Sequence, residues 1–251
     1  MENNDFIFGI HPVIEAIESG RTVDKLMVKK DLNGELAVRL LHLARAHNVP
    51  VQRVPVERLG RYTRKNHQGV VAIMAATAYH RLGDVMPTLF EDGVLPFILV
   101  LDGITDVRNF GAIARTAECC GVNAIVIPER GSVGVGGDAV KTSAGALLNI
   151  PVCRERNLVA GVRYLKDSGC RIVCATEKSS ENYTLGDYTA PVALVMGAED
   201  VGISPEILDL ADVRAAIPMF GRIGSLNVSV AAGVMMYEVV RQRLLANLEV
   251  E

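Results

Sequence analysis

Hydrophobic residues in the first 76 positions alternate between short continuous runs and runs with helical spacing. The sequences HPVIEAIESG and GELAVRLLHLARAHN repeat apolar residues every three or four positions, which is typical of amphipathic helices, and ERLGRYT predicts a shorter helix. Four strands are predicted by the apolar runs FIFG, DKLMVKK, VPVQRVP and GVVAIMA. Residues 1–76 are therefore expected to form a small α/β domain.

The pattern breaks after this domain and then restarts. Residues 77–96 contain two prolines and two glycines, which predicts a linker. From residue 97 onward, helical patterns separate the strand-like runs FILVLDG, NAIVIP, PVCRE, RIVCAT, VALVMG and VRAAIP. Runs rich in Val, Ile and Leu that alternate with helices predict a parallel sheet covered on both faces. Residues 97–251 are thus expected to form a second α/β domain.

Composition narrows the class of protein. The chain has 251 residues, of which 49% are hydrophobic and 22% charged, as in a folded protein with room for two domains. We expect neither an export signal nor a membrane-spanning segment. Its five cysteines are odd in number and form no CxxC pair, so we expect reduced core residues in a cytoplasmic protein and no metal site.

The net charge of −3 conceals an uneven distribution. Residues 1–80 carry 11 Lys/Arg against 8 Asp/Glu and hold all five histidines, whereas residues 81–251 carry 15 against 21. This division favours a first domain that faces a polyanion. Ordinary surface variation is the alternative.

One glycine-rich loop resembles a dinucleotide-binding fingerprint. The sequence GSVGVGGDA places Gly134, Gly136 and Ala139 at G-x-G-x-x-A spacing. In a nicotinamide enzyme this motif follows the first strand directly. Here Pro128, Glu129 and Arg130 separate the apolar residues of NAIVIP from the loop, and NAIVIP is not the first strand of its domain. The loop is therefore interpreted as a flexible connection, and a dehydrogenase is disfavoured.

The last predicted helix begins unusually. The chain carries no charge between Arg222 and Glu238, and this apolar stretch opens with Gly-Ser-Leu-Asn. Ser225 or Asn227 caps the helix, or the pair also presents polar atoms to a ligand. The helix is apolar on more faces than one core covers, which predicts a homodimer through the second domain.

Three blocks at strand ends carry the strongest signal, and all three occur in one order along the chain: LDGITDVRNFGAIARTAECCG at 101–121, ALVMGAEDVGIS at 193–204 and IPMFGRIGSLNVSVAAGVMMYE at 217–238. Together they resemble the motifs of the SpoU family of RNA ribose 2′-O-methyltransferases. The blocks depart from the family pattern at four positions, namely Val107, Phe110, Ala198 and Asp200. In the first domain, FGIHPVIEAI and HQGVVA resemble the markers of the family's substrate-binding domain.

This resemblance implies a fold and a cofactor. It implies that residues 97–251 form an α/β-knot (SPOUT) domain, whose C-terminal segment threads a trefoil knot around S-adenosylmethionine. It also implies that residues 1–76 form a ribosomal-protein-like domain that binds the RNA substrate. Gly197, Ile217 and Leu226 match the positions expected to contact the cofactor.

The resemblance also implies roles in the reaction. Arg115 is the chief candidate at the ribose hydroxyl, where it binds the adjacent phosphate or polarises the hydroxyl; the alternative is a solvated arginine paired with Glu118. Asn109 is expected to orient Arg115 or the ribose, or else only to cap its helix.

Motifs two and three supply the remaining candidates. Glu199 is expected to anchor Arg115 or Asn109 across the site, with a surface turn as its alternative role. Ser225 and Asn227 are expected to hold the active loop and the target nucleotide.

The expected function is methylation of a ribose 2′-hydroxyl, that of a guanosine in 23S rRNA, with S-adenosylmethionine as methyl donor. The alternatives are the same reaction on tRNA and, in a different class, a non-catalytic RNA-binding protein. We expect RNA and a second copy of the chain as partners, and neither a membrane nor DNA.

Overall fold

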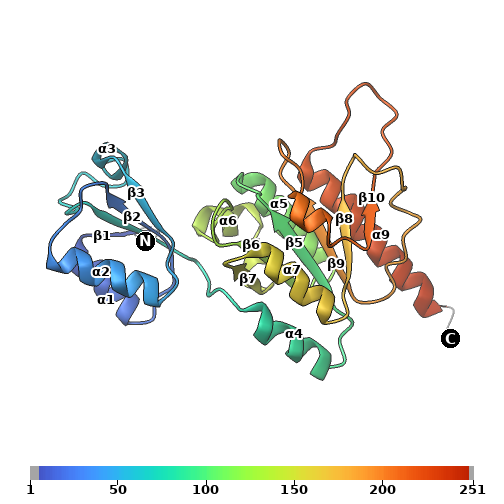
Figure 1. Ribbon diagram of the computed structural model, residues 1–251, viewed down its shortest axis with the longest axis horizontal. Coiled ribbons are helices and arrows are strands. Elements are labelled where there is room, and N and C mark those ends of the chain that lie inside the picture. Colours follow the sequence, from blue (N-terminus) through green and yellow to red (C-terminus); the bar gives the residue numbers. More distant parts are fainter. Residues whose placement is uncertain (1–5, 249–251) are drawn as a thin grey trace. The chain divides into compact units, whose positions relative to one another are not determined.

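The computed structural model describes residues 6–248, which divide into two compact units (Figure 1). Unit 1 contains the residues up to Ala78 together with Gly134–Asp138. Unit 2 contains Tyr79–Val133 and the residues from Ala139 onward. Each unit combines helices with one β-sheet.

Unit 1 is a four-stranded mixed sheet in the order β1-β4-β2-β3, with β2 and β3 parallel and the other pairs antiparallel. Its elements are β1 (Phe6–Phe8), α1 (Ile10–Glu18), β2 (Val23–Lys29), α2 (Glu35–Ala46), β3 (Val51–Val54), α3 (Val56–Leu59) and β4 (Val70–Met74).

The core of unit 1 lies on both faces of its sheet. Helices α1 and α2 pack on one face, where Ile17 and Leu40 belong to the same buried cluster as Leu26 and Val28 of β2. Helix α3 places Leu59 on the other face against Met27. Alternating residues of β2 therefore point to opposite faces, as the two-residue period of a strand requires.

Unit 2 contains a six-stranded sheet, parallel throughout, in the order β10-β8-β9-β5-β6-β7. Its strands are β5 (Phe97–Asp102), β6 (Ala124–Pro128), β7 (Val152–Glu155), β8 (Arg171–Ala175), β9 (Val192–Gly197) and β10 (Val213–Ala215). The prediction of a parallel sheet is confirmed.

Helices cover both faces of this sheet (Figure 1). Helices α4 (Leu82–Glu91), α7 (Leu158–Asp167) and α8 (Pro205–Leu208) bury apolar residues against one face. Helix α5 (Val107–Cys119) packs against α9 (Val228–Leu248) on the other. The double cover explains why the central strands are continuous apolar runs without polar alternation.

The segment that the sequence predicts as a linker, residues 77–96, contains helix α4. Leu82 and Met86 of this helix are buried with Cys153 and Val162 in the core of unit 2. The helix includes Pro87, one of the prolines that favoured a linker. The structure therefore separates the two units between Ala78 and Tyr79.

A second difference concerns the helix predicted over DAVKTSAGALLN. The structure divides it into α6 (Gly137–Thr142) and the 3₁₀ turn η1 (Ala146–Leu148). Ala144 and Gly145 adopt left-handed backbone angles, with φ of 51° and 89°. Such residues end a right-handed helix, because they turn the chain out of the helical path.

Four of the five cysteines are buried, and Cys119 is exposed. Burial, together with the nearby charges of Glu155 and Asp84, raises the pKa of the Cys153 thiol to about 12. Burial likewise raises the pKa of Cys174 to about 12. These thiols are therefore protonated at neutral pH and behave as small core residues.

Helix α9 buries a charged residue in the middle of its apolar stretch. Glu238 is 6% exposed, and its carboxylate accepts hydrogen bonds from Arg241 at 2.7 and 2.8 Å. Gln242 Nε2 donates to the same carboxylate at 2.8 Å. The hydrogen bond from Arg241 holds the pKa of Glu238 below its usual range.

Within residues 6–248, no helix combines the length and the apolar character needed to cross a bilayer.

Candidate active site

The site lies at the carboxyl edge of the parallel sheet, beside the point where the strand order reverses. Strands β5 and β9 are neighbours in the sheet although the chain between them forms β6, β7 and β8. Ligands of open parallel sheets bind outside the strand ends at such a point. Helix α5 follows β5, and the loop from residue 198 follows β9, so both begin here.

The start of α5 is capped by Asp106, and Asn109 has another role. The Asp106 side chain accepts hydrogen bonds from the backbone N–H groups of Arg108 and Asn109, each at 2.8 Å. The alternative that Asn109 only caps its helix is therefore wrong. Its side-chain amide is left available for contacts across the sheet.

Asn109, Glu199 and Asn227 come together as a hydrogen-bonded cluster. Asn227 Nδ2 donates to Glu199 Oε1 at 2.6 Å and to Asn109 Oδ1 at 3.0 Å. Asn109 Nδ2 donates to Glu199 Oε1 at 3.4 Å. The cluster joins one residue from each of the three sequence blocks, and Glu199 accepts hydrogen bonds from both asparagines.

Asn227 caps helix α9 with help from Glu199. Asn227 Oδ1 accepts a hydrogen bond from the Ser229 N–H at 3.0 Å, and the Asn227 carbonyl accepts one from Ala231 N–H at 3.0 Å. Glu199 Oε1 accepts from the Val228 N–H at 3.0 Å. A carboxylate at a helix N-terminus is also favoured by the helix dipole. The cap predicted at Ser225 or Asn227 is thus Asn227.

A cavity of about 560 Å³ opens beside this cluster. Three loops form its walls: residues 176–178 after β8, residues 197–203 around the turn after β9, and residues 225–228 before and at the start of α9. Gly197, Glu199, Ser225, Leu226 and Asn227 all line it. Ser225 therefore faces the cavity.

A smaller cavity of about 80 Å³ shares part of this lining. Ile217 contributes to it with Leu226, Met196 and Met219. The three residues expected to contact a cofactor, Gly197, Ile217 and Leu226, therefore gather at one place in the fold.

Sequence reasoning overlooked the loop after β8. Thr176, Glu177 and Lys178 line the main cavity, and Thr176 and Glu177 also line the smaller one. Their signal in the sequence is their place at the end of the strand run RIVCAT and directly after it, at a carboxyl strand end. No motif marks them, because Thr, Glu and Lys are ordinary residues of exposed turns.

Gly197 is required by the fold of its own loop. A β-carbon at this position would lie 2.2 Å from the Gly202 carbonyl carbon and 2.3 Å from the Ile203 nitrogen. The turn also holds a hydrogen bond from Gly202 N–H to the Ala198 carbonyl at 2.8 Å. Glycine therefore lets the chain fold back tightly and aim Glu199 at Asn227. Asp200, in the same turn, lines the cavity.

Arg115 lies apart from the cluster. It is exposed on α5, six residues after Asn109, which corresponds to about 9 Å along a helix axis and a different face. Within residues 6–248, Arg115 forms no ion pair, and the predicted alternative of a pair with Glu118 is not present. Its guanidinium is therefore available to a ligand.

A two-unit chain with these features belongs to the class of RNA methyltransferases. Residues 96–237 match the model of the SpoU rRNA methylase family, and residues 6–80 match the model for RNA 2′-O ribose methyltransferase substrate binding. The chain is a member of the SpoU (TrmH-like) family and an RNA ribose 2′-O-methyltransferase. The resemblance seen in the sequence is confirmed.

Known proteins similar over nearly the whole chain support this. A Bacillus subtilis protein assigned to the TrmH family of tRNA/rRNA methyltransferases is 36% identical, covering 96% of this chain and 97% of its own. The rRNA methyltransferase of Sinorhizobium meliloti, solved with S-adenosylmethionine bound, has a TM-score of 0.59 and 27% identity over 94% of this chain and 86% of its own. The SpoU methyltransferase AviRb from Streptomyces viridochromogenes, in complex with the same cofactor, has a TM-score of 0.58 and 25% identity over 96% and 90%. Unit 2 thus has the α/β-knot (SPOUT) fold class.

Proposed function

We propose that this enzyme transfers a methyl group from S-adenosylmethionine to the ribose 2′-hydroxyl of a guanosine in 23S rRNA. The observation that carries the proposal is the cluster of Asn109, Glu199 and Asn227 at the rim of a cavity of about 560 Å³. Its polar groups converge beside a space large enough for a small-molecule ligand, which is the arrangement expected of an active site.

The cavity fits S-adenosylmethionine. Its volume is within the range of cofactor pockets, roughly 300–1,000 Å³. Leu226, Met196 and Ile217 offer apolar surface to the adenosyl part, while Glu177 and Glu199 offer carboxylates to charged groups. When bound, the cofactor supplies a methyl group made electrophilic by its sulfonium. In the trefoil knot that we propose for this segment, the three wall-forming loops are held together around the cofactor.

The chain's own residues then position the ribose and assist the loss of its proton. The hydroxyl must lie in line with the methyl group, and the amides of Asn109 and Asn227 are placed to orient it. A guanidinium is always protonated and cannot serve as a general base. Arg115 therefore binds the phosphate next to the target ribose or polarises the hydroxyl, which lowers the barrier to proton loss.

Unit 1 supplies the RNA-binding surface in this proposal. It carries the basic excess of residues 1–80 and the two markers FGIHPVIEAI and HQGVVA, whose likeness to the rRNA guanosine enzymes favours 23S rRNA over tRNA. An RNA substrate of this kind places the enzyme in the cytoplasm, with no role for a membrane or DNA. The domain boundary proposed for it lies near Ala76, two residues before the division at Ala78.

The substrate is tested by mapping ribose methylation in RNA from a strain that lacks the gene. We expect one guanosine of 23S rRNA to lose its 2′-O-methyl group and to regain it when the purified enzyme and S-adenosylmethionine are added. Loss of a ribose methyl in tRNA, with rRNA unchanged, would contradict the proposed substrate and establish the tRNA alternative.

The enzyme is also proposed to be a homodimer through unit 2. Val230, Tyr237, Leu244 and Leu248 recur at seven- and four-residue spacing on α9, and all four are exposed. An apolar stripe of this kind is more often a protein interface than a solvated surface. Sedimentation at micromolar concentration should give the mass of two chains. Replacing Tyr237 and Leu244 with Glu should give one, and a wild-type monomer would contradict the proposal.

A further inference from the structure

Several strand ends of unit 1 meet at one edge of its sheet. Lys29 at the end of β2 pairs with Val54 at the end of β3, because these strands are parallel. Val70, where β4 begins, pairs with Val28, and Phe8 at the end of β1 pairs with Val71. The loops that follow β2 and β3 and the loop that precedes β4 therefore lie along the same edge.

These loops carry an excess of positive charge. We define the basic edge by its Lys and Arg residues, which are Lys29, Lys30, Arg53, Arg58, Arg61, Arg64 and Lys65. The acidic residues in the same segments are Asp31, Glu35 and Glu57. Lys29 lies 3.7 Å from Asp31, and no other member of the basic edge forms an ion pair with residues 6–248. Most of this charge is thus left for a partner.

The loop of residues 60–69 is held in a defined conformation. Gln68 Oε1 accepts a hydrogen bond from the Ile10 N–H at 3.0 Å, which ties the loop to the start of α1. The Gly69 carbonyl accepts from the Lys29 N–H at 2.8 Å, and His67 Nδ1 accepts from the Gly69 N–H at 3.0 Å. Earlier in the loop, the Leu59 carbonyl accepts from the Tyr62 N–H at 3.0 Å, and Thr63 Oγ1 accepts from the Lys65 N–H at 3.1 Å. The basic residues of the loop are therefore carried by a hydrogen-bonded backbone, which lowers the entropy cost of binding.

An aromatic residue is placed among these charges. Tyr62 is 39% exposed, and its ring makes an edge contact with Phe6, with ring centroids 5.9 Å apart. Exposed aromatic rings beside Arg and Lys are the means by which proteins stack unpaired bases while binding the backbone. An acidic protein segment would use the charges but would give Tyr62 no planar partner.

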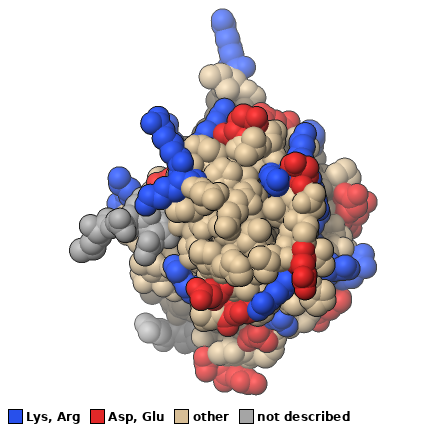
Figure 2. Space-filling view, turned by 90° about the vertical axis from the view of Figure 1, so that its left-hand side faces the viewer, with Lys and Arg blue, Asp and Glu red and all other residues tan. Residues whose placement is uncertain are grey.

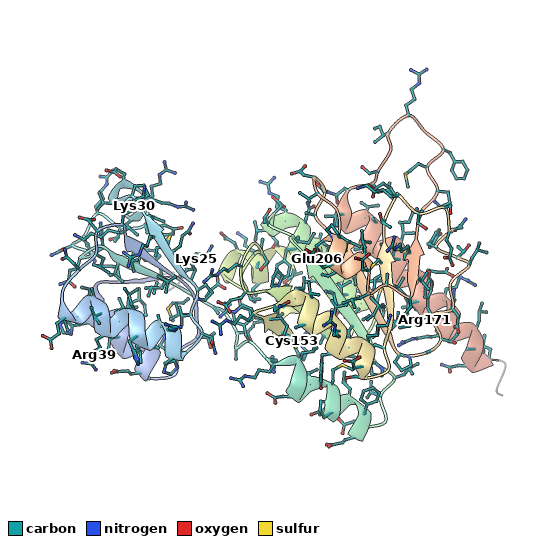
Figure 3. All side chains as sticks on the ribbon, viewed as in Figure 1. Lys25, Lys30, Arg39, Cys153, Arg171 and Glu206 are labelled. Carbon is teal, nitrogen blue, oxygen red and sulfur yellow. The ribbon has the colours of Figure 1, made fainter. Side chains whose placement is uncertain are left out.

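On the side of unit 1 formed by α1 and α2, an arginine is already paired with an acidic residue. Arg39 on α2 is paired with Glu18 on α1 at 2.7 Å, and Glu15 is nearby on α1. Lys30 lies beside α3, away from Arg39 (Figure 3). In the view of Figure 2, Lys and Arg side chains project at the upper left, and others lie at the right and lower margins with Asp and Glu among them.

We propose that the basic edge is the surface of unit 1 that binds the RNA substrate. Its Lys and Arg side chains contact the phosphate backbone, and Tyr62 stacks on an unpaired base in a loop or bulge next to the methylated nucleotide. This assignment rests on the proposed function, and it adds the surface and the kind of RNA that it fits. Single-stranded loops are where such stacking is available, because bases within an A-form helix are already stacked.

The test compares two triple variants of the full chain that remove equal charge. The first is Arg61→Gln, Arg64→Gln and Lys65→Gln; the control, on the other side of the unit, is Arg21→Gln, Arg39→Gln and Arg45→Gln. Methyl transfer to total RNA from the gene-deleted strain is measured over a range of salt concentrations. We expect the first variant to raise the KM for RNA roughly tenfold or more. A plot of the logarithm of RNA affinity against the logarithm of salt concentration should become less steep. Its slope should change by about 0.7–0.9 for each phosphate that the enzyme no longer neutralises.

The control variant should keep the wild-type KM for RNA and salt dependence. Both variants should bind S-adenosylmethionine in calorimetry as the wild type does, which shows that unit 2 is intact. Equal KM values for the two variants would overturn the assignment of the basic edge. Failure of the proposed function is a different result, since the wild-type enzyme would then transfer no methyl group to any RNA. Tyr62→Phe should retain RNA binding and Tyr62→Ala should weaken it; equal binding by both would remove stacking from the proposal.

Discussion

Replacing Arg115 with alanine should reduce methyl transfer roughly 100-fold or more, as expected for a group that assists proton loss in the transition state. The free energy of unfolding should change by less than about 0.5 kcal/mol, because Arg115 is an exposed side chain without an ion pair in the described chain. Turnover with S-adenosylmethionine and rRNA measures the first effect, and urea unfolding measures the second. The affinity for S-adenosylmethionine should not change, since Arg115 does not line the cavity.

The variant Arg115→Lys separates charge from geometry. Lysine keeps the positive charge but lacks the planar fork that binds a phosphate or hydroxyl from two directions. We expect Arg115→Lys to bind RNA better than Arg115→Ala does, while its turnover stays low. An Arg115→Lys enzyme with full activity would show that a positive charge alone is needed at this position. Arg108→Ala, in the first turn of the same helix, is a matched control for the loss of an exposed arginine.

The second large effect is expected at Asn227. Asn227→Ala removes the cap of α9 and the donor that joins Glu199 to Asn109, so it should lower both stability and turnover. Loss of a helix cap costs about 0.5–2 kcal/mol of unfolding free energy. Turnover should fall roughly 100-fold, since small displacements of positioning groups are costly to catalysis. If Asn227 acted on the ribose alone, its loss would leave the free energy of unfolding unchanged. Because Asn227 also caps α9, we expect this free energy to fall.

The variant Asn227→Ser distinguishes the two roles. Serine caps helices as well as asparagine does, so the unfolding free energy should return to within about 0.5 kcal/mol of the wild type. Serine has no amide to bridge Glu199 and Asn109, so turnover should remain low. Recovery of both stability and turnover in Asn227→Ser would mean that the cap is the whole contribution of this residue.

Sequence patterns predict the elements well but their boundaries less well. Runs of Val, Ile and Leu predict the buried strands of unit 2 because burial on both faces leaves no place for polar alternation. Helix α4 was not predicted, because Pro87 favoured a linker. Leu82 and Met86 nevertheless have helical spacing and are buried in the core. Ala144 adopts a left-handed conformation that no local pattern of its type predicts.

For the site as well, some features follow from the sequence and others from the fold. The family and the three blocks can be recognised without the structure, and the blocks predict Asn109, Glu199 and Asn227 as site residues, because each block is a run of several matching residues. The contacts among these residues depend on the folded chain, since Asn109 and Glu199 are 90 positions apart and Asn109 and Asn227 are 118 apart. Their meeting depends on β5 and β9 being neighbours at the point where the strand order reverses. Strand order is set by the packing of helices on the sheet between segments far apart in the chain. Hydrophobic periodicity is a local property, so it does not predict strand order.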